Sequence, residues 1–96
     1  MYQLFFSKSF DRHYTKFKRK DKKLVEKIDK TLELFRANPF FVSLKTHKVN
    51  TNNFGEVLSS WVTGDVRIIW DFDKENISII LLLDMGKHSG AKKVYK

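Results

Sequence analysis

Residues 64–95 read GDVRIIWDFDKENISIILLLDMGKHSGAKKVY, and this run predicts two long strands joined by a polar turn. Residues 66–72 alternate between an apolar set and a less apolar one, which is the pattern of a strand with one buried face. Residues 73–76 are polar, with turn formers at both ends. Residues 77–83 are apolar almost throughout, and a strand that is apolar on both faces is usually central in its sheet. We therefore expect a β-hairpin whose second strand is central and is ended by Asp84.

The residues before this hairpin predict one short strand, two helices and a further strand. Residues 2–6 are aromatic and apolar, which suits a strand. Apolar side chains then recur at helical spacing in residues 10–20 and again in residues 21–38, where an Asn-Pro pair stops the second helix. Residues 40–53 are expected to be irregular, and residues 55–62 alternate as a strand.

The order strand, helix, helix, strand, strand, strand predicts a single α+β domain that spans residues 1–96. Consecutive strands joined by tight turns form an antiparallel meander, and two adjacent amphipathic helices form a hairpin that packs on it. The chain has no cysteine, so disulfides and thiolate metal sites are excluded. It shows no signal-peptide pattern and no apolar run of transmembrane length, and we expect a cytoplasmic protein that does not associate with membranes.

Positive charge is concentrated in the first half of the chain. The formal net charge is +8, and residues 1–50 carry all of it, because residues 51–96 are neutral overall. Charge of this size suggests a polyanion or a strongly acidic protein as partner, and the alternative is a solvated helical face. The candidate RNA contacts are Lys16, Lys18, Arg19, Lys20, Lys22, Lys23, Lys45, Lys48, Lys92 and Lys93.

Further polar side chains fall in loops or at strand ends and suit acid–base chemistry on a phosphodiester. Cleavage of RNA through its 2′-hydroxyl needs a base for that hydroxyl, an acid for the leaving 5′-oxygen, and positive charge at the phosphorane. Histidine serves as base or acid near neutral pH, arginine binds phosphate, and this route requires neither a metal nor a small-molecule cofactor. The candidate catalytic residues are His47, Asp65, Arg67, His88 and Tyr95.

Each candidate also has an ordinary structural interpretation. His47 also suits an exposed loop histidine, and Arg67 suits a surface ion pair with a neighbouring aspartate. His13, on the first helix, is expected to have no functional role. Trp61 and Trp70 are more typical of a core than of a platform for base stacking. The aspartates have no convincing metal-ligand spacing with the histidines, so we expect no metal site.

The ordered features resemble a family of bacterial type II toxins, the RelE/ParE superfamily, and within it the RelE- and YafQ-like ribonucleases. The resemblance covers nearly the whole chain: a short first strand, a basic helical hairpin, and then LKTHKV, GDVRIIWDF and ILLLDMGKHSGAKKVY. His47, in LKTHKV, and Asp65, in the turn before the Arg67 strand, look like catalytic residues of the YafQ-like enzymes. His88, in GKHS, looks like their histidine at the end of the last strand. Tyr95 looks like a terminal aromatic that stacks on or orients the substrate.

The resemblance implies a RelE-like fold and a toxin that cleaves mRNA bound in the decoding site of the ribosome. It also implies a small, partly disordered cognate antitoxin, and basic helices that contact ribosomal RNA through charge. The superfamily includes ParE-like inhibitors of DNA gyrase, which share the fold but lack the nuclease residues, so the fold alone does not decide the function. A gyrase-directed toxin and a non-enzymatic RNA- or protein-binding module with a decayed site are the alternatives.

Two details of the site stay open at the level of sequence. Trp61 stands about where YafQ-like toxins have another histidine. The sequence does not assign the base and the acid among His47, Asp65 and His88.

Overall fold

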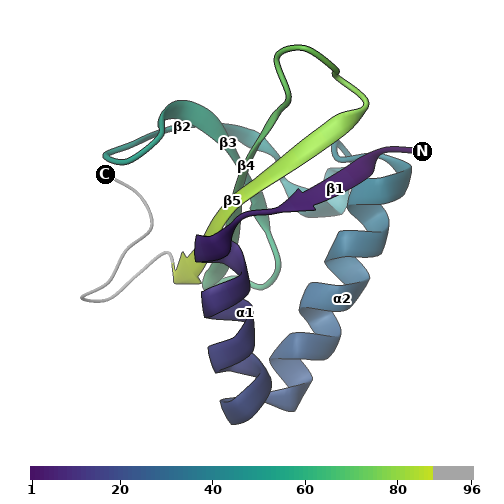
Figure 1. Cartoon of the computed structure of the whole chain (residues 1–96). Coiled ribbons are helices and arrows are strands. Elements are labelled where there is room, and N and C mark those ends of the chain that lie inside the picture. Colours follow the sequence, from purple (N-terminus) through teal and green to yellow (C-terminus); the bar gives the residue numbers. More distant parts are fainter. Residues whose placement is uncertain (88–96) are drawn as a thin grey trace.

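The computed structural model describes residues 1–87, which fold into two α-helices packed on one face of a five-stranded sheet (Figure 1). The elements follow in the order β1 (Gln3–Phe6), α1 (Lys8–Lys20), α2 (Lys22–Ala37), the 3-10 helix η1 (Val42–Leu44), β2 (His47–Thr51), β3 (Gly55–Trp61), β4 (Val66–Phe72) and β5 (Ile79–Lys87). The predicted α+β class and helical hairpin are confirmed.

The sheet has the strand order β1-β5-β4-β3-β2 and combines a meander with one parallel pair. Strands β2 to β5 each pair antiparallel with their neighbours in sequence, and β1 lies parallel to β5 at the opposite edge. Strand β5 is therefore paired on both sides, as its apolar sequence predicts. The expected antiparallel meander is confirmed and gains the strand β2.

The prediction that residues 40–53 are irregular is wrong for the second half of that segment. His47 to Thr51 form the edge strand β2, which is paired with β3 from the His47–Ser59 pair to the Thr51–Gly55 pair. The sequence HKVNT contains one aliphatic side chain, so hydrophobic alternation could not reveal it. An edge strand of this kind is specified by backbone pairing with its neighbour more than by side-chain burial.

The predicted end of the last strand is also wrong, because β5 continues through Asp84 to Lys87. A β-bulge allows this continuation. Ile69 lies opposite Asp84 whereas Trp70 lies opposite Leu82, which leaves Leu83 as the extra residue on β5. The bulge shifts the side-chain alternation of β5 by one residue. Met85 therefore faces the core on the same side as Leu82, although a charged residue lies between them.

The hydrophobic core lies between the sheet and the helices. It is formed by Val66, Ile68 and Trp70 of β4, Ile80, Leu82 and Met85 of β5, and Phe10, Ile28 and Phe35 of the helices. Trp70 is fully buried, donates its indole N–H to Ser60 Oγ over 2.8 Å, and packs edge-on against Phe35 with ring centroids 5.2 Å apart. The predicted alternation of β4 and the core position of Trp70 are thus confirmed.

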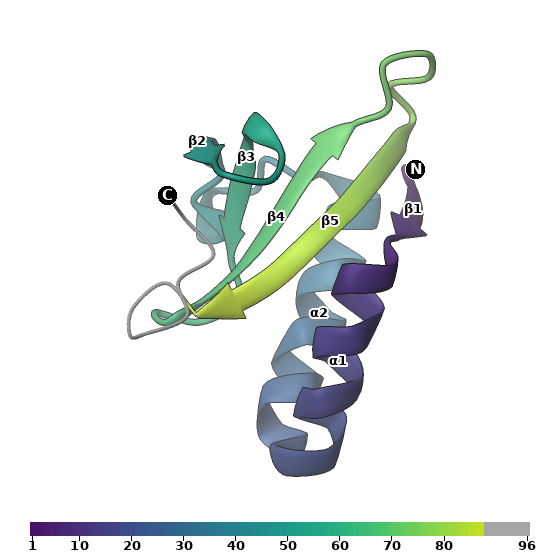
Figure 2. The ribbon, with the colours of Figure 1, turned by 60° about the vertical axis from the view of Figure 1, so that its left-hand side comes forward.

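The two helices meet in a turn at Asp21 that projects beyond the sheet (Figure 2). The backbone N–H of Asp21 donates to the Phe17 carbonyl oxygen at the end of α1, and its carboxylate accepts from the Leu24 N–H at the start of α2. Around this turn the basic side chains of Lys16, Lys18, Arg19, Lys20, Lys22 and Lys23 are all exposed. We call this group the hairpin-tip cluster. Within residues 1–87, neither helix has the length and apolar character needed to cross a membrane.

Candidate active site

The predicted catalytic residues His47, Asp65 and Arg67 lie at the same end of the sheet, where β2 begins, β3 ends and β4 begins. The remaining predicted site residues, His88, Lys92, Lys93 and Tyr95, lie outside the described residues. The geometry below therefore concerns the part of the site that β2, β3 and β4 supply.

The strand register places His47 and Arg67 on the face of the sheet that is turned away from the helices. His47 lies opposite Ser59, which lies opposite Ile69, and Trp61 lies opposite Arg67. Directly opposed residues of antiparallel strands share a face, as do residues two apart on one strand. We call this surface the His47 face; it comprises His47, Ser59, Trp61, Arg67 and Ile69.

Lys48 lies on the other face. It is opposite Leu58, which is opposite Trp70, and both of these pack on the helical side of the sheet. The alternation of β2 therefore separates Lys48 from His47, although the two are adjacent in sequence. Lys45 is the lysine of this segment that reaches the His47 face, because its Nζ lies 4.1 Å from the centroid of the Trp61 ring.

The imidazole of His47 is held by a backbone carbonyl. Its Nδ1 lies 2.8 Å from the carbonyl oxygen of Lys45. A carbonyl oxygen only accepts hydrogen bonds, so Nδ1 carries a proton and Nε2 is the unprotonated nitrogen of the neutral ring. The side chain is exposed. This arrangement gives the ring a defined tautomer in which Nε2 suits the role of proton acceptor.

Lys45 provides that carbonyl from an unusual backbone conformation. Among residues 1–87 it is the only non-glycine residue with a positive φ, with φ 48° and ψ 43°. Its N–H donates to the Val42 carbonyl oxygen and so closes η1. A left-handed conformation costs a residue with a side chain about 1–2 kcal/mol, so the surrounding contacts must hold it in place.

Arg67 is buried against the indole ring of Trp61. Arg67 is only 4% exposed. Its Cζ lies 4.0 Å from the centroid of the Trp61 ring, and its Nη1 donates to the Thr63 carbonyl oxygen over 2.7 Å. Each cation on an indole ring contributes about 0.5–1 kcal/mol at an exposed site and about 2 kcal/mol when desolvated. The burial of Arg67 fits a structural cation below the site better than an exposed phosphate ligand or a surface ion pair.

Asp65 lies in the turn between β3 and β4, and Thr63 organises that turn. The Thr63 hydroxyl accepts hydrogen bonds from the N–H groups of Asp65 and Val66, at 3.2 and 3.0 Å. Val62 and Thr63 in turn donate their N–H groups to the Val66 carbonyl oxygen. Since Arg67 binds the carbonyl of the same Thr63, the backbone of Asp65 is tied to the base of β4.

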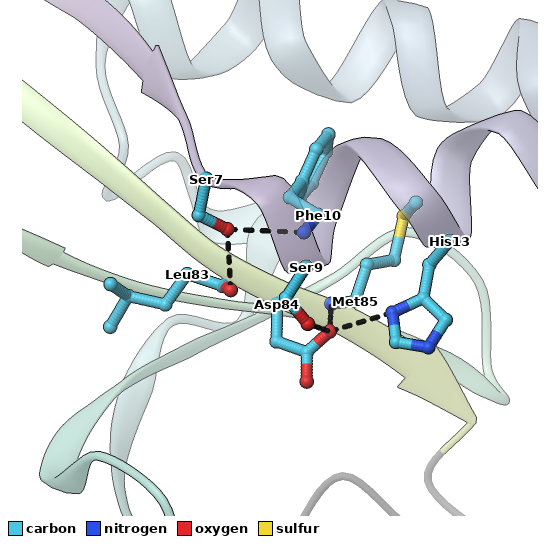
Figure 3. Close-up of polar contacts among 7 residues, drawn as sticks. All are labelled: Ser7, Ser9, Phe10, His13, Leu83, Asp84 and Met85. Carbon is cyan, nitrogen blue, oxygen red and sulfur yellow. Dashed lines mark hydrogen bonds and ion pairs between the residues drawn. The ribbon is translucent and has the colours of Figure 1, made fainter.

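A polar network between α1 and β5 was missed by the sequence analysis (Figure 3). One carboxylate oxygen of Asp84 lies 2.8 Å from His13 Nδ1, and it accepts from the Ser9 hydroxyl at 3.0 Å and from the Met85 N–H at 2.8 Å. His13, which was expected to have no functional role, thus has a structural one, because it joins a helix to the sheet. The available signal was the spacing of Ser9 and His13, which are four residues apart and share one face of α1.

No family model and no curated protein matches this sequence. Solved structures nevertheless match nearly the whole chain. A chain of the YoeB–YefM toxin–antitoxin complex from Staphylococcus aureus shares 24% identity and has a TM-score of 0.66, with 88% of this chain and 93% of that chain covered. The YoeB/ParE toxin from Agrobacterium tumefaciens shares 18% identity with a TM-score of 0.71, over 91% of this chain and 99% of that chain.

A third match is the DinJ–YafQ complex from E. coli, at 16% identity and a TM-score of 0.71, with 92% of this chain and 94% of that chain covered. At these identities the likeness concerns the fold, and a shared fold hosts different functions. The resemblance to the RelE/ParE superfamily, carried in the sequence by short motifs, is therefore confirmed as a shared fold.

Proposed function

We propose that this chain is the toxin of a toxin–antitoxin system and a metal-independent endoribonuclease that cleaves ribosome-bound mRNA in the cytoplasm. The observation that carries the proposal is the exposed imidazole of His47, which is anchored by the Lys45 carbonyl on the same sheet face where the Lys45 ammonium lies against Trp61. The fold shared with YoeB and YafQ supports it. The motifs that contain Asp65, His88 and Tyr95 support it further.

In the proposed reaction His47 is the base. Its Nε2 accepts the proton of the 2′-hydroxyl, and the 2′-oxygen attacks the adjacent phosphorus. The bond from phosphorus to the 5′-oxygen then breaks as that oxygen takes a proton from His88, which leaves a 2′,3′-cyclic phosphate and a 5′-hydroxyl. A base and an acid that act in this way each contribute about 10²–10⁴-fold to the rate.

The other residues of the site have supporting roles in this proposal. The ammonium of Lys45 stabilises the negative charge that develops on the phosphorane oxygens. Asp65 orients a protonated partner and favours its charged form, and Tyr95 orients the nucleotide at the cleavage site. Arg67, because it is buried, acts from below through Trp61 and Thr63.

Binding to the ribosome is assigned to the hairpin-tip cluster. Its six exposed cations, which are Lys16, Lys18, Arg19, Lys20, Lys22 and Lys23, lie away from the His47 face, at the end of the helical hairpin that projects from the sheet. Charge of this kind binds phosphate without sequence preference, so it supplies affinity and leaves the chemistry to the sheet. We also propose a cognate antitoxin, as in the YoeB–YefM and DinJ–YafQ complexes.

The test is cleavage of a defined mRNA on purified ribosomes, read by primer extension, with the product ends identified chemically. We expect cleavage to 2′,3′-cyclic phosphate ends, and His47→Ala to lower the rate by about 10²–10⁴-fold. Lys74→Met, which removes an exposed lysine from the turn between β4 and β5, is the matched surface control and should cleave normally. Intact mRNA together with inhibited DNA supercoiling would instead support the gyrase alternative, and intact mRNA without it the decayed binding module.

A further inference from the structure

A continuous set of contacts runs from His47 to the turn of Asp65, and its middle is the indole ring of Trp61. The proposed chemistry uses the two ends of this set, and Trp61 enters it only as a neighbour of Arg67. The ring is half-buried at the end of β3, on the His47 face, and two cations from different segments lie against it.

The first half of the set joins Trp61 to His47 through Lys45. The Lys45 side chain places its Nζ 4.1 Å from the ring centroid, while its carbonyl oxygen holds His47 Nδ1 at 2.8 Å. One residue thus connects to Trp61 through its side chain and to His47 through its backbone. Because Lys45 has a left-handed φ of 48°, its carbonyl direction depends on contacts that keep the residue in that conformation.

The second half joins Trp61 to the turn of Asp65 through Arg67. The Arg67 guanidinium lies 4.0 Å from the same ring centroid, and its Nη1 donates to the Thr63 carbonyl oxygen over 2.7 Å. The hydroxyl of Thr63 accepts the N–H of Asp65 at 3.2 Å. The indole therefore stands between the segment that fixes His47 and the turn that carries Asp65.

We propose that Trp61 is a positioning residue. Through Lys45 it keeps the His47 ring in its Nδ1-protonated tautomer, and through Arg67 it fixes the position of the Asp65 turn relative to that ring. The catalytic part of this inference rests on the proposed nuclease function, whereas the tautomer part does not. Trp61 acts through neighbouring residues and does not contact the substrate. A displacement of about 1 Å in a reacting group lowers rates by about 10²-fold, so positioning of this kind has a measurable effect.

The test compares Trp61→Leu, Trp61→Phe and Lys45→Met with the wild-type protein by imidazole ¹⁵N NMR and by cleavage kinetics. In wild-type protein the His47 resonances should report a protonated Nδ1. In Trp61→Leu and Lys45→Met this signature should weaken, and kcat should fall by about 10–100-fold with KM changed less. Trp61→Phe keeps an aromatic face for the cations, so its Nδ1–H signature and its kcat should lie between those of Trp61→Leu and of the wild-type protein.

The matched control for Lys45→Met is Lys74→Met, which removes the same charge at the opposite end of β4 and should leave both readouts unchanged. If Trp61→Leu does not fold, as judged by circular dichroism, Lys45→Met tests the same link from the exposed side. In the Trp61→Leu/Lys45→Met double variant the Nδ1–H signature should be no weaker than in the poorer single variant, since both changes break the same link to His47.

A retained Nδ1–H signature in folded Trp61→Leu and Lys45→Met would overturn the proposal, even if cleavage fell. A fall in cleavage that is due to a raised KM, with the tautomer retained, would also overturn the proposal, because that result would identify Trp61 as a substrate contact. If the wild-type protein cleaves no RNA at all, the NMR comparison alone decides whether Trp61 positions His47. Failure of the nuclease proposal and failure of this inference are therefore distinguishable.

Discussion

The two faces of strand β4 are equally well buried but are built by different interactions. Toward the helices, Ile68 and Trp70 are both 0% exposed and lie in a continuous apolar core. On the His47 face, Arg67 is 4% exposed and Ile69 1% exposed, but the contacts around Arg67 are two backbone carbonyls and an indole ring. The comparison teaches that two equally buried faces of one strand can be built differently, one by apolar packing and the other by polar and cation–π contacts.

Replacing Trp70, on the face of β4 that packs on the helices (the packing face), should give the largest loss of stability. Trp70→Ala deletes a fully buried ring and leaves the Ser60 hydroxyl without its indole partner, so we expect a loss of about 3–5 kcal/mol in the free energy of unfolding. Urea denaturation followed by circular dichroism measures it. Trp61→Ala, the matching change on the His47 face, should cost about 2–3 kcal/mol, because one of the two cations on its ring is desolvated. Equal losses from the two variants would contradict the proposed difference between the faces.

His88 is expected to have a large effect on catalysis and little effect on folding. If it is the general acid, His88→Ala lowers cleavage of ribosome-bound mRNA by about 10²–10⁴-fold. His88→Arg should retain more activity than alanine, because a cation still stabilises the phosphorane without efficient proton transfer. Single-turnover cleavage with each purified variant gives both rates. A folded His88→Ala protein with nearly wild-type cleavage would remove His88 from the mechanism.

The packing face could be predicted from the sequence, and the His47 face could not be predicted to the same depth. Period-two alternation fixes which side of β4 is apolar, so Trp70 and its neighbours follow from the pattern. The environment of Trp61 depends on the left-handed conformation of Lys45 and on the register that puts Arg67 opposite it. Neither the conformation nor the register can be predicted from hydrophobic periodicity. A family resemblance proposes which residues react, but it does not contain the contacts that hold them.

The same reason explains the missed elements. Strand β2 is polar and lies at an edge, so only its pairing with β3 defines it. The bulge at Leu83 changes the alternation of β5 in a way that depends on its pairing with β4. The contact between His13 and Asp84 joins residues 71 positions apart. Each of these features is set by tertiary structure, beyond the reach of local patterns.

The hairpin-tip cluster should affect binding and leave chemistry unchanged. Replacing Lys18, Arg19 and Lys20 by alanine removes three exposed charges, so affinity for ribosomes should fall by about tenfold near physiological salt, with a shallower dependence on salt concentration. Filter binding at several salt concentrations measures both quantities, and saturating single-turnover cleavage should keep the wild-type rate. Unchanged binding at every salt concentration would identify the cluster as a solvated helical face.

The contact between α1 and β5 should give the smallest effect, one of stability alone. His13→Ala removes the imidazole from the Asp84 carboxylate, and because these side chains are 34% and 19% exposed, water compensates part of the loss. We expect about 1 kcal/mol in the free energy of unfolding, and a coupling of similar size in a double-mutant cycle with Asp84→Ala. Arg12→Ala changes an exposed neighbour on the same helix and should stay within about 0.5 kcal/mol of wild type. A His13→Ala variant as stable as Arg12→Ala, with no coupling to Asp84, would show that the hydroxyl of Ser9 and the N–H of Met85 suffice to hold this carboxylate at the bulge.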